Sequence, residues 1–430
     1  MKKLSVIIIG FGGRGSQYAH HMLTLPDKYE IVAVADPVEG RRNTAKEMCN
    51  LSDDMLFHSW EDILAKPKFA DIAVISMVDH LHYDSSLKAI DLGYDLLLEK
   101  PVAPSPKECA EIAFAAQKKG VSVLVCHVLR YSYFYQTVKK ALMDGIVGDV
   151  MSIVAVEGVN TIHQSHSFVR GNWGNSKKSS CMLLQKSCHD MDIIQWLLDK
   201  PCKQVSSFGK LTYFTKAHAP EGAPVRCADG GCPVGDACPY NCIKLYYDDK
   251  DNAWFRRAAT RSFAKTGKPT DEEVIHALKT TDYGLCVFQA NNDVVDHQVV
   301  NMEFEGDTTV HFTMTAFAKG GRYIRILGTE GELSAYTDNE TLTFFNHADK
   351  TTTQIPILKP EEISIHGGGD LGILLELYDY LSGNYTGYCA ADIVRSVKNH
   401  MLVFAAEKAR LNNTVESIDA YMAEFGLTND

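Results

Sequence analysis

A lysine at the end of an apolar run is the first residue of this sequence that could perform chemistry. The run Asp95–Leu98 leads directly into Glu99, Lys100 and Pro101. An ammonium group at the end of a buried strand can give a proton to a substrate hydroxyl, or take one from it, as hydride moves at the neighbouring carbon. We therefore predict that Lys100 is catalytic and that Glu99 holds it in place. The alternative is a surface ion pair at a strand end, which the preceding apolar run disfavours.

A glycine-rich turn near the N-terminus predicts a dinucleotide site. The apolar run Leu4–Ile9 is followed by a G-x-G-x-x-G turn and then by a segment with helical apolar spacing. Such a unit lets the backbone approach a pyrophosphate and presents a helix N-terminus to it. A second apolar strand, 31–35, ends in an acidic residue that can bind ribose hydroxyls and would repel a 2′-phosphate, so NAD(H) is favoured over NADP(H). The cofactor residues predicted here are Gly10, Gly12, Gly13, Arg14, Gly15 and Asp36.

Alternating strands and helices must position these groups. We expect strands at 4–9, 31–35, 71–76, 94–98 and 121–126, and helices near 14–24, 39–49, 84–92 and 106–119. This alternation predicts a parallel sheet with helices on both faces, in which ligands bind beyond the carboxyl ends of the strands. The further cofactor residues expected at that edge are Ser76, His80, His82, Glu99, Lys100 and His127. His80 and His82 are also placed to begin the next helix, and that alternative stays open.

Together, the glycine turn, Asp36, the segment 76–84 and Glu99-Lys100-Pro101 resemble the glucose–fructose oxidoreductase/inositol dehydrogenase/MocA (Gfo/Idh/MocA) family over essentially the whole chain. The resemblance implies an α/β protein, with an N-terminal Rossmann domain at 1–127 and a C-terminal α/β domain at 128–430. The second domain would carry a large open, mostly antiparallel sheet. NAD(P) and a sugar or cyclitol would bind between the domains, and the chain would form a dimer or tetramer through the sheet.

The resemblance also places a second catalytic motif at Gln185–Asp190. Family members usually carry an Asp four residues before a His; His189 matches the His, but Gln185 stands at the Asp position and cannot act as a base. We therefore expect Lys100 and His189 to handle the hydroxyl proton, and Lys186 to contact a substrate oxygen.

Groups suited to a polyhydroxylated ligand gather in the loop 163–173. A tryptophan supplies a stacking face, and imidazole and guanidinium groups hydrogen-bond hydroxyls; an oligomer contact is the alternative. Asp296 and His297 interrupt an apolar strand, and they either pair with nearby groups or, as we favour, line the pocket. The predicted substrate residues are Arg130, His166, Arg170, Trp173, Lys186, His189 and His297. His366 and Asp370, which flank three glycines, approach the substrate, or Asp370 only caps a helix.

An insertion at about 216–270 contains four cysteines within sixteen residues, Cys227, Cys232, Cys238 and Cys242. The segment is too short to own a core, so cross-linking would have to stabilise it. Thiolate-rich ligation suits a structural Zn²⁺ ion or an iron–sulfur cluster. The spacing C-x4-C-x5-C-x3-C matches neither a zinc knuckle nor a ferredoxin, so free or regulatory thiols remain an alternative.

The composition limits the possible partners. A net charge of −11 over 430 residues argues against nucleic acid or an anionic membrane, and no apolar run approaches the ~20 residues that span a bilayer. We expect a cytoplasmic homo-oligomer with a small carbohydrate or cyclitol substrate, and a closing helix at 390–410 that packs back on the body.

The predicted function is an NAD(H)-dependent oxidoreductase that acts on a secondary alcohol of a sugar, glycoside or cyclitol. One alternative is redox-neutral glycoside cleavage through a transient 3-keto sugar with retained NAD. Another is a non-catalytic NAD-bound sensor or partner subunit.

Overall fold

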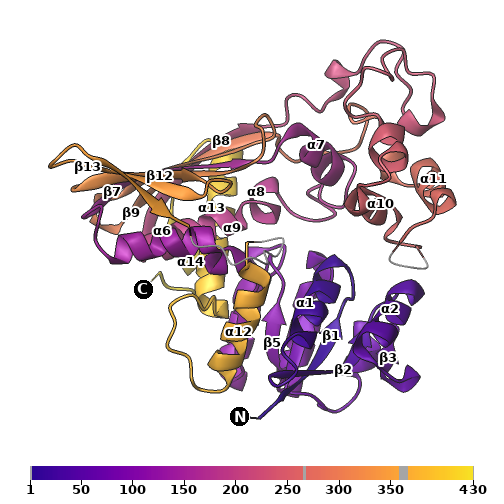
Figure 1. Cartoon of the computed structure of the whole chain (residues 1–430), viewed down its shortest axis with the longest axis horizontal. Helices are drawn as coiled ribbons and strands as arrows, with labels where there is room; N and C mark the ends of the chain where they lie inside the picture. Colours follow the sequence, from indigo (N-terminus) through magenta and orange to yellow (C-terminus); the bar gives the residue numbers. More distant parts are fainter. Residues whose placement is uncertain (1, 265–267, 358–366, 430) are drawn as a thin grey trace.

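The first 127 residues fold around a six-stranded parallel sheet with the order β3-β2-β1-β4-β5-β6 (Figure 1). The computed structural model describes residues 2–264, 268–357 and 367–429. The strands are β1 (Leu4–Ile9), β2 (Tyr29–Ala35), β3 (Leu56–Phe57), β4 (Ile72–Ile75), β5 (Asp95–Leu98) and β6 (Val123–Val125). The helices are α1 (Gly13–Leu23), α2 (Glu39–Cys49), α3 (Trp60–Leu64), α4 (His82–Leu92) and α5 (Pro106–Lys119). The predicted Rossmann arrangement is therefore confirmed.

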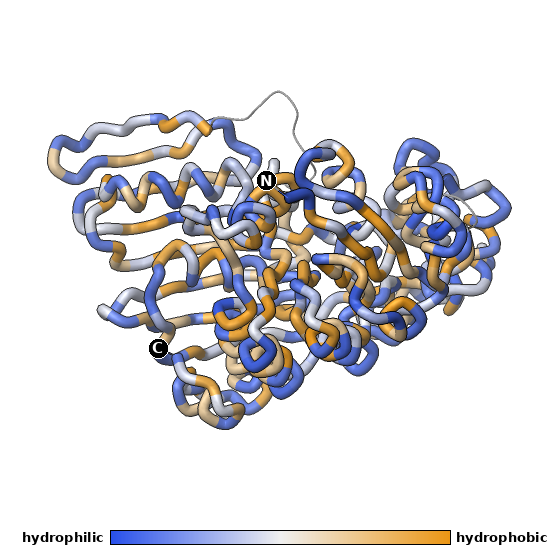
Figure 2. The backbone as a smooth tube through the Cα atoms, turned by 90° about the horizontal axis from the view of Figure 1, so that it is seen from below, coloured by the Kyte–Doolittle hydropathy of each residue, from blue (hydrophilic) through white to orange (hydrophobic). Residues whose placement is uncertain are grey.

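Local sequence explains these elements well. Strands β4 and β5 are buried almost throughout because helices cover both faces of the sheet, which requires continuous apolar runs. Helix α5 begins where the Ser105 side chain accepts the Glu108 N–H, with Pro106 in its first turn, and it ends at Gly120 in the left-handed conformation. In Figure 2, hydrophobic stretches follow the strands of this sheet, whereas the loops between elements are hydrophilic.

The second domain is built on a nine-stranded sheet with the order β14-β13-β12-β11-β7-β10-β9-β8-β15. Within this sheet, only the β7–β10 pair is parallel among the pairings of the described residues, so the expected open, mostly antiparallel sheet is confirmed. The strands are β7 (Val150–Gly158), β8 (Cys202–Lys210), β9 (His297–Phe304), β10 (Thr309–Thr315), β11 (Gly321–Gly328), β12 (Gly331–Tyr336), β13 (Thr341–Asn346), β14 (Thr352–Pro356) and β15 (Val415–Ser417).

Helices cover the face of this sheet that is turned toward the first domain (Figure 1). They include α6 (Tyr133–Met143), α9 (Cys188–Leu198) and the long α13 (Ile393–Asn412), which packs against β8, α5 and α9. Helix α12 (Gly369–Leu381) lies beside α1. The opposite face carries half-exposed apolar side chains, including Phe208 and Tyr336. No helix of the described residues is long and apolar enough to cross a membrane.

The cysteine-rich insertion occupies the stretch between β8 and β9 and stands apart from both sheets (Figure 1). It contains helices α10 (Ala253–Thr260) and α11 (Asp271–Thr280). Its buried residues form small apolar clusters of their own, one of which joins Cys242, Tyr246 and Phe255 to the α11 residues. The expectation that this region lacks a core was therefore wrong, because residues beyond the cysteine segment complete it.

Candidate active site

The turn between β1 and α1 has the shape that a pyrophosphate requires. Gly10 has φ +93°, and a Cβ on Gly15 would lie 2.0 Å from the Gly10 carbonyl oxygen, so Gly15 lets the helix pack on the strand. A Cβ on Gly13 would meet nothing within 4 Å, and one on Gly12 would meet only Arg41, at 3.8 Å. No side chain caps α1, so its first N–H groups face open space. The turn therefore fits a dinucleotide.

Asp36 and Ser76 fasten this turn to the ends of the neighbouring strands. The Asp36 carboxylate accepts the N–H groups of Phe11 and Val38, both at 2.8 Å, and lies 3.4 Å from Arg41 Nη1. The Ser76 hydroxyl donates to the Gly10 carbonyl at 2.7 Å. Both side chains are buried next to the glycines, where the sequence places them, so Asp36 stays the predicted ribose acceptor.

Arg14 and Glu99 bind each other. Arg14 Nε lies 2.6 Å from Glu99 Oε1, and Arg14 Nη2 lies 2.7 Å from Asp370 Oδ1. The Tyr18 hydroxyl also donates to Glu99, at 2.6 Å. Burial raises the pKa of Glu99, but the Arg14 charge outweighs it and leaves this pKa below its usual value.

The predicted roles of Glu99 and Arg14 therefore change. The Glu99 carboxylate reaches Lys100 only through the backbone N–H, at 3.1 Å, so it does not hold the ammonium group. Arg14 and Glu99 form an ion pair, and Arg14 also pairs with Asp370 of α12, so both charged groups already have partners within the protein. Asp370 is likewise bound by Arg14, and His366 lies outside the described residues.

Lys100 follows β5 at the sheet edge, and its Nζ donates a 2.8 Å hydrogen bond to the backbone carbonyl of Gln185. The described residues give it no carboxylate partner. Its peptide bond to Pro101 is cis. The Gln185 side chain points away from the lysine, and its amide donates to Asp79, to Ser179 at 2.7 Å and to Ser180 at 2.8 Å. Gln185 thus offers the lysine a neutral acceptor.

The imidazole rings of His127, His189 and His400 lie close together near Lys100. The ring centroids of His127 and His189 are 5.9 Å apart, and those of His127 and His400 are 5.8 Å apart. Burial, opposed by the nearby Asp192, lowers the pKa of His127 to about 4, so this imidazole is neutral at neutral pH. His189, near the start of α9, is only partly buried and remains positioned for the proton-transfer role.

His127 and Arg130 lie inside the protein. Both are fully buried, and Arg130 forms a bidentate pair with Asp192, at 2.7 and 2.6 Å. The cofactor contact of His127 and the substrate contact of Arg130 stay predictions, since neither side chain is exposed in this structure. Their partner Asp192 lies three residues after His189, at a spacing that places the two side chains on neighbouring parts of one helix.

Lys186 belongs to a buried charge network next to His189. Its Nζ lies 3.2 Å from Glu157 Oε1 on β7, and Arg322 Nε lies 2.8 Å from the other Glu157 oxygen and 2.7 Å from Asp190. Burial lowers the pKa of Lys186 and raises that of Asp190 to about 6. The sequence analysis did not identify Glu157 or Arg322 as site residues. A charged residue in an alternating strand such as β7 could have indicated Glu157.

A cavity of about 360 Å³ opens between the first domain and the insertion. His80 and Trp173, both predicted, line it together with polar groups; the main ones are Asp79, Asn172, Asn175, Lys178, Ser179, Arg261, Asp282 and Asn291. The insertion meets the first domain where Arg41 Nη2 donates to the Arg261 carbonyl, at 2.6 Å. Asp79 links the cavity to Gln185 and so to Lys100.

Three further predicted histidines do not line this cavity. His82 is buried, with ring nitrogens 2.8 Å from the Pro101 oxygen and 3.3 Å from the Met77 oxygen, so it shapes the strand ends. His166 is buried among insertion aromatics such as Tyr246. His297 is 44% exposed on the opposite face of the sheet from Glu157, because its neighbour Gln298 pairs in register with the inward-facing residues.

Arg170 and the cysteines also differ from expectation. Arg170 is 2% exposed, and its guanidinium donates to the backbone carbonyls of Leu285, at 2.8 Å, and Tyr240, at 2.7 Å, so it anchors the insertion. Arg170 also lines the cavity beside Trp173, so its substrate role stays a prediction. Among the described residues, no group of three or more His, Cys, Asp or Glu side chains is already arranged to hold a metal ion.

Comparison with known proteins decides the family. The description "Oxidoreductase family, NAD-binding Rossmann fold" matches residues 4–127, and "Oxidoreductase family, C-terminal alpha/beta domain" matches residues 139–394. The chain belongs to the Gfo/Idh/MocA oxidoreductase family. As the family implies, it is an NAD-binding oxidoreductase with dehydrogenase relatives that act on CH–OH groups.

The curated relatives of this Gfo/Idh/MocA protein are distant. The Bacillus subtilis protein YteT is 24% identical over 341 residues, 74% of this chain and 76% of YteT. The 2,7-anhydro-N-acetylneuraminate hydratase of Escherichia coli is 25% identical over 47% of this chain and 51% of the hydratase. An inositol 2-dehydrogenase/D-chiro-inositol 3-dehydrogenase of Lactiplantibacillus plantarum is 23% identical over 47% of this chain and 54% of that enzyme.

Solved structures share the fold over nearly the full length. Levoglucosan dehydrogenase in complex with NADH and L-sorbose superposes with a TM-score of 0.71 at 14% identity, covering 97% of this chain and 99% of that one. The aldose-aldose oxidoreductase of Caulobacter crescentus gives 0.66 at 14% identity, covering 97% of this chain and 100% of that one. At such identities, these likenesses establish the fold alone.

Proposed function

We propose that this protein transfers hydride between NAD(H) and a secondary alcohol carbon of a sugar, glycoside or cyclitol. The observation that carries the proposal is Lys100, a half-buried lysine at the carboxyl end of β5 whose Nζ, among the described residues, binds only a neutral carbonyl. Bound NAD would supply or accept the hydride at its nicotinamide ring. Gly12, Gly13 and Asp36 would hold the dinucleotide, since the open glycine turn and the carboxylate meet at one sheet edge.

The chain's own groups then handle the substrate proton. Lys100 takes the hydroxyl proton when the alcohol is oxidised and returns it when the ketone is reduced. His189 lies near the start of α9, close to His127, and is the second proton carrier. Lys186 holds a substrate oxygen, and its pairing with Glu157 fixes its position.

A carbohydrate fits the cavity beside this edge. Its wall combines the Trp173 ring, which suits the C–H faces of a sugar, with amide and charged groups that hydrogen-bond hydroxyls. The relatives named for inositol and levoglucosan point to the same chemical class. NAD is preferred to NADP because Asp36 lies where a 2′-phosphate would stand. We also propose a cytoplasmic homo-oligomer, formed through the half-exposed apolar face of the large sheet.

The second candidate is a redox-neutral reaction in which the same bound NAD first accepts and then returns the hydride. A relative named as a hydratase favours it, because hydration changes no net oxidation state.

A substrate screen tests both candidates. Purified protein is mixed with a panel of glycosides, free sugars and inositols, and NADH is followed by absorbance while products are analysed by mass spectrometry. A dehydrogenase produces NADH in proportion to product. A redox-neutral enzyme changes the substrate with NAD still bound and no net NADH. A protein that binds NAD but alters none of the panel, in either readout, contradicts both candidates and favours a sensor.

A further inference from the structure

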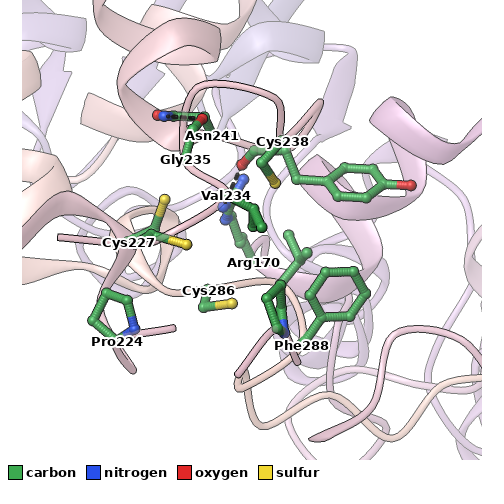
Figure 3. Close-up of a pocket in the computed structure, with 13 residues that line it drawn as sticks. Arg170, Pro224, Cys227, Val234, Gly235, Cys238, Asn241, Cys286 and Phe288 are labelled. Carbon is green, nitrogen blue, oxygen red and sulfur yellow. Dashed lines mark hydrogen bonds between the residues drawn. The ribbon is translucent and has the colours of Figure 1, made fainter. Parts of the chain in front are cut away.

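The insertion encloses a small cavity whose wall is rich in thiols. Its volume is about 20 Å³, and Cys227, Cys232, Cys238 and Cys286 all line it. Three of these residues belong to the cysteine-rich segment, but Cys286 follows α11, far from that segment in sequence. Figure 3 shows the side chains of Cys227, Cys238 and Cys286 around the same space as Arg170. The remaining wall is mostly apolar and includes Val234, Val287 and Phe288.

A buried positive charge lies against this cavity without a negative partner. Arg170 forms no ion pair within the described residues, and its Nη1 is buried without a hydrogen-bond partner. The guanidinium donates to two backbone carbonyls and lies 5.9 Å from the centre of the Tyr246 ring, and none of these groups carries a negative charge, which is costly in an apolar surrounding. The groups beside it that can become negative are the thiols, because a cysteine that binds a metal does so as a thiolate.

We propose that Cys227, Cys232, Cys238 and Cys286 bind one Zn²⁺ ion that fixes the insertion. Each thiol loses its proton to solvent as its sulfur–zinc bond forms, with no change of oxidation state. Four thiolates and one Zn²⁺ carry a net charge of −2, and the adjacent Arg170 offsets half of it. Four sulfurs satisfy the tetrahedral preference of a structural zinc site.

The cavity has room for a single ion. Its volume of about 20 Å³ exceeds the roughly 10–15 Å³ that holds a water molecule. The thiols are not yet gathered at metal-binding distance. A cysteine sulfur moves when its side chain rotates between staggered rotamers, so thiols that border one cavity can close around an ion without a backbone change.

The site also revises the ligand set suggested by the spacing of the cysteines. Cys242 is fully buried in the apolar cluster with Tyr246 and Phe255 and does not line the cavity. Cys286 takes its place. Zinc would thus join the cysteine-rich segment to the chain that returns toward β9, and so would fasten both ends of the insertion to each other.

Metal analysis of the full-length protein tests the proposal without any turnover assay. We expect about one zinc per chain after reconstitution with ZnCl₂ and dialysis, and replacement by Co²⁺ should give thiolate charge-transfer absorption. Cys286→Ala should retain less than about a tenth of the zinc, whereas the matched variant Cys242→Ala should retain it. Circular dichroism checks that both variants are folded.

Alkylation provides a second readout that does not depend on the folding of a variant. In the wild-type protein, zinc should slow the modification of Cys227, Cys232, Cys238 and Cys286 by N-ethylmaleimide at least tenfold, and a chelator should restore it. The proposal is overturned if the wild-type protein retains no zinc, if it contains iron and sulfide instead, if zinc leaves the alkylation rates unchanged, or if folded Cys242→Ala loses zinc.

Discussion

Lys100 Nζ donates a 2.8 Å hydrogen bond to the backbone carbonyl oxygen of Gln185, the residue that stands where the family usually has an aspartate. That hydrogen bond uses the backbone carbonyl, which residue 185 offers whatever its side chain is, and the Gln185 amide donates to Asp79, Ser179 and Ser180 instead. A carbonyl accepts a hydrogen bond from either an ammonium or an amine, because both forms carry N–H groups. Among the described residues, Lys100 therefore has no carboxylate partner.

The first prediction concerns Lys100→Met, which removes the amine and keeps much of the side-chain volume. We expect turnover to fall by ~10²-fold or more, because general acid–base catalysis contributes about that much. NAD affinity, measured by fluorescence titration, should stay near the wild-type value. Lys118→Met, on the exposed side of α5, is the matched control and should leave both quantities unchanged. Near-normal turnover of Lys100→Met would refute the proton-transfer role.

The second prediction separates two glycines of the same turn. Gly12→Ala adds a methyl group that meets no protein atom closer than 3.8 Å, so the melting temperature should hardly change. NAD affinity should nevertheless fall by tenfold or more, since the methyl group stands where the pyrophosphate approaches. Gly15→Ala places its methyl group 2.0 Å from the Gly10 oxygen and should instead destabilise the fold. If Gly12→Ala binds NAD normally, the dinucleotide does not use this turn.

The third prediction concerns the choice of dinucleotide. Asp36→Asn keeps the shape of the side chain but removes the charge that repels a 2′-phosphate. Hydrogen bonds to charged groups contribute about 1.5–3 kcal/mol, so we expect the preference for NAD over NADP to fall by roughly tenfold or more. Arg41, 3.4 Å from the carboxylate, is then free to meet the phosphate. The ratio of kcat/KM values for the two dinucleotides measures the effect, and an unchanged ratio would place the ribose elsewhere.

The fourth prediction concerns stability at mildly acidic pH. Burial lowers the pKa of His127 to about 4 and that of His400 to about 3, whereas an unfolded histidine titrates near 6.5. The unfolded chain therefore binds these protons first. The free energy of unfolding is therefore highest above pH ~6.5. As the pH drops toward the folded-state pKa values, each histidine lowers it by up to about 1.4 kcal/mol per pH unit.

Denaturant unfolding at several pH values between 7.5 and 5 measures this slope. His400→Gln should be less stable at every pH but should show a shallower slope than the wild type. Ser396→Ala alters the same buried location without removing a titratable group and should keep the wild-type slope. Equal slopes in His400→Gln and the wild type would mean that the pKa of His400 is the same in the folded and unfolded chains.

Local patterns in the sequence were sufficient to predict the elements of the first domain and to place the site residues that follow its strands. Lys100 and Asp36 could be placed because the carboxyl ends of parallel strands share one edge, so that position along the chain determines position in space. The glycine turn is equally local, since its geometry depends on the residues within it.

Long-range pairing is what the sequence could not reveal. Glu99 accepts hydrogen bonds from Arg14 and Tyr18 rather than from the adjacent lysine, and Arg14 also binds Asp370 near the far end of the chain. His297 was assigned to the pocket from its residue type, whereas the register of its strand decides which face it occupies. No pattern in sequence connects such partners, because they meet only after both domains have folded.

The contact between Arg41 and the Arg261 carbonyl means that the insertion rests on the rim of the first domain, next to Asp36. A coenzyme whose ribose lies at Asp36 would sit beneath that contact. Exchange with the surrounding pool would then require the insertion to lift first. Such a latch suits an enzyme that keeps one coenzyme molecule through many turnovers.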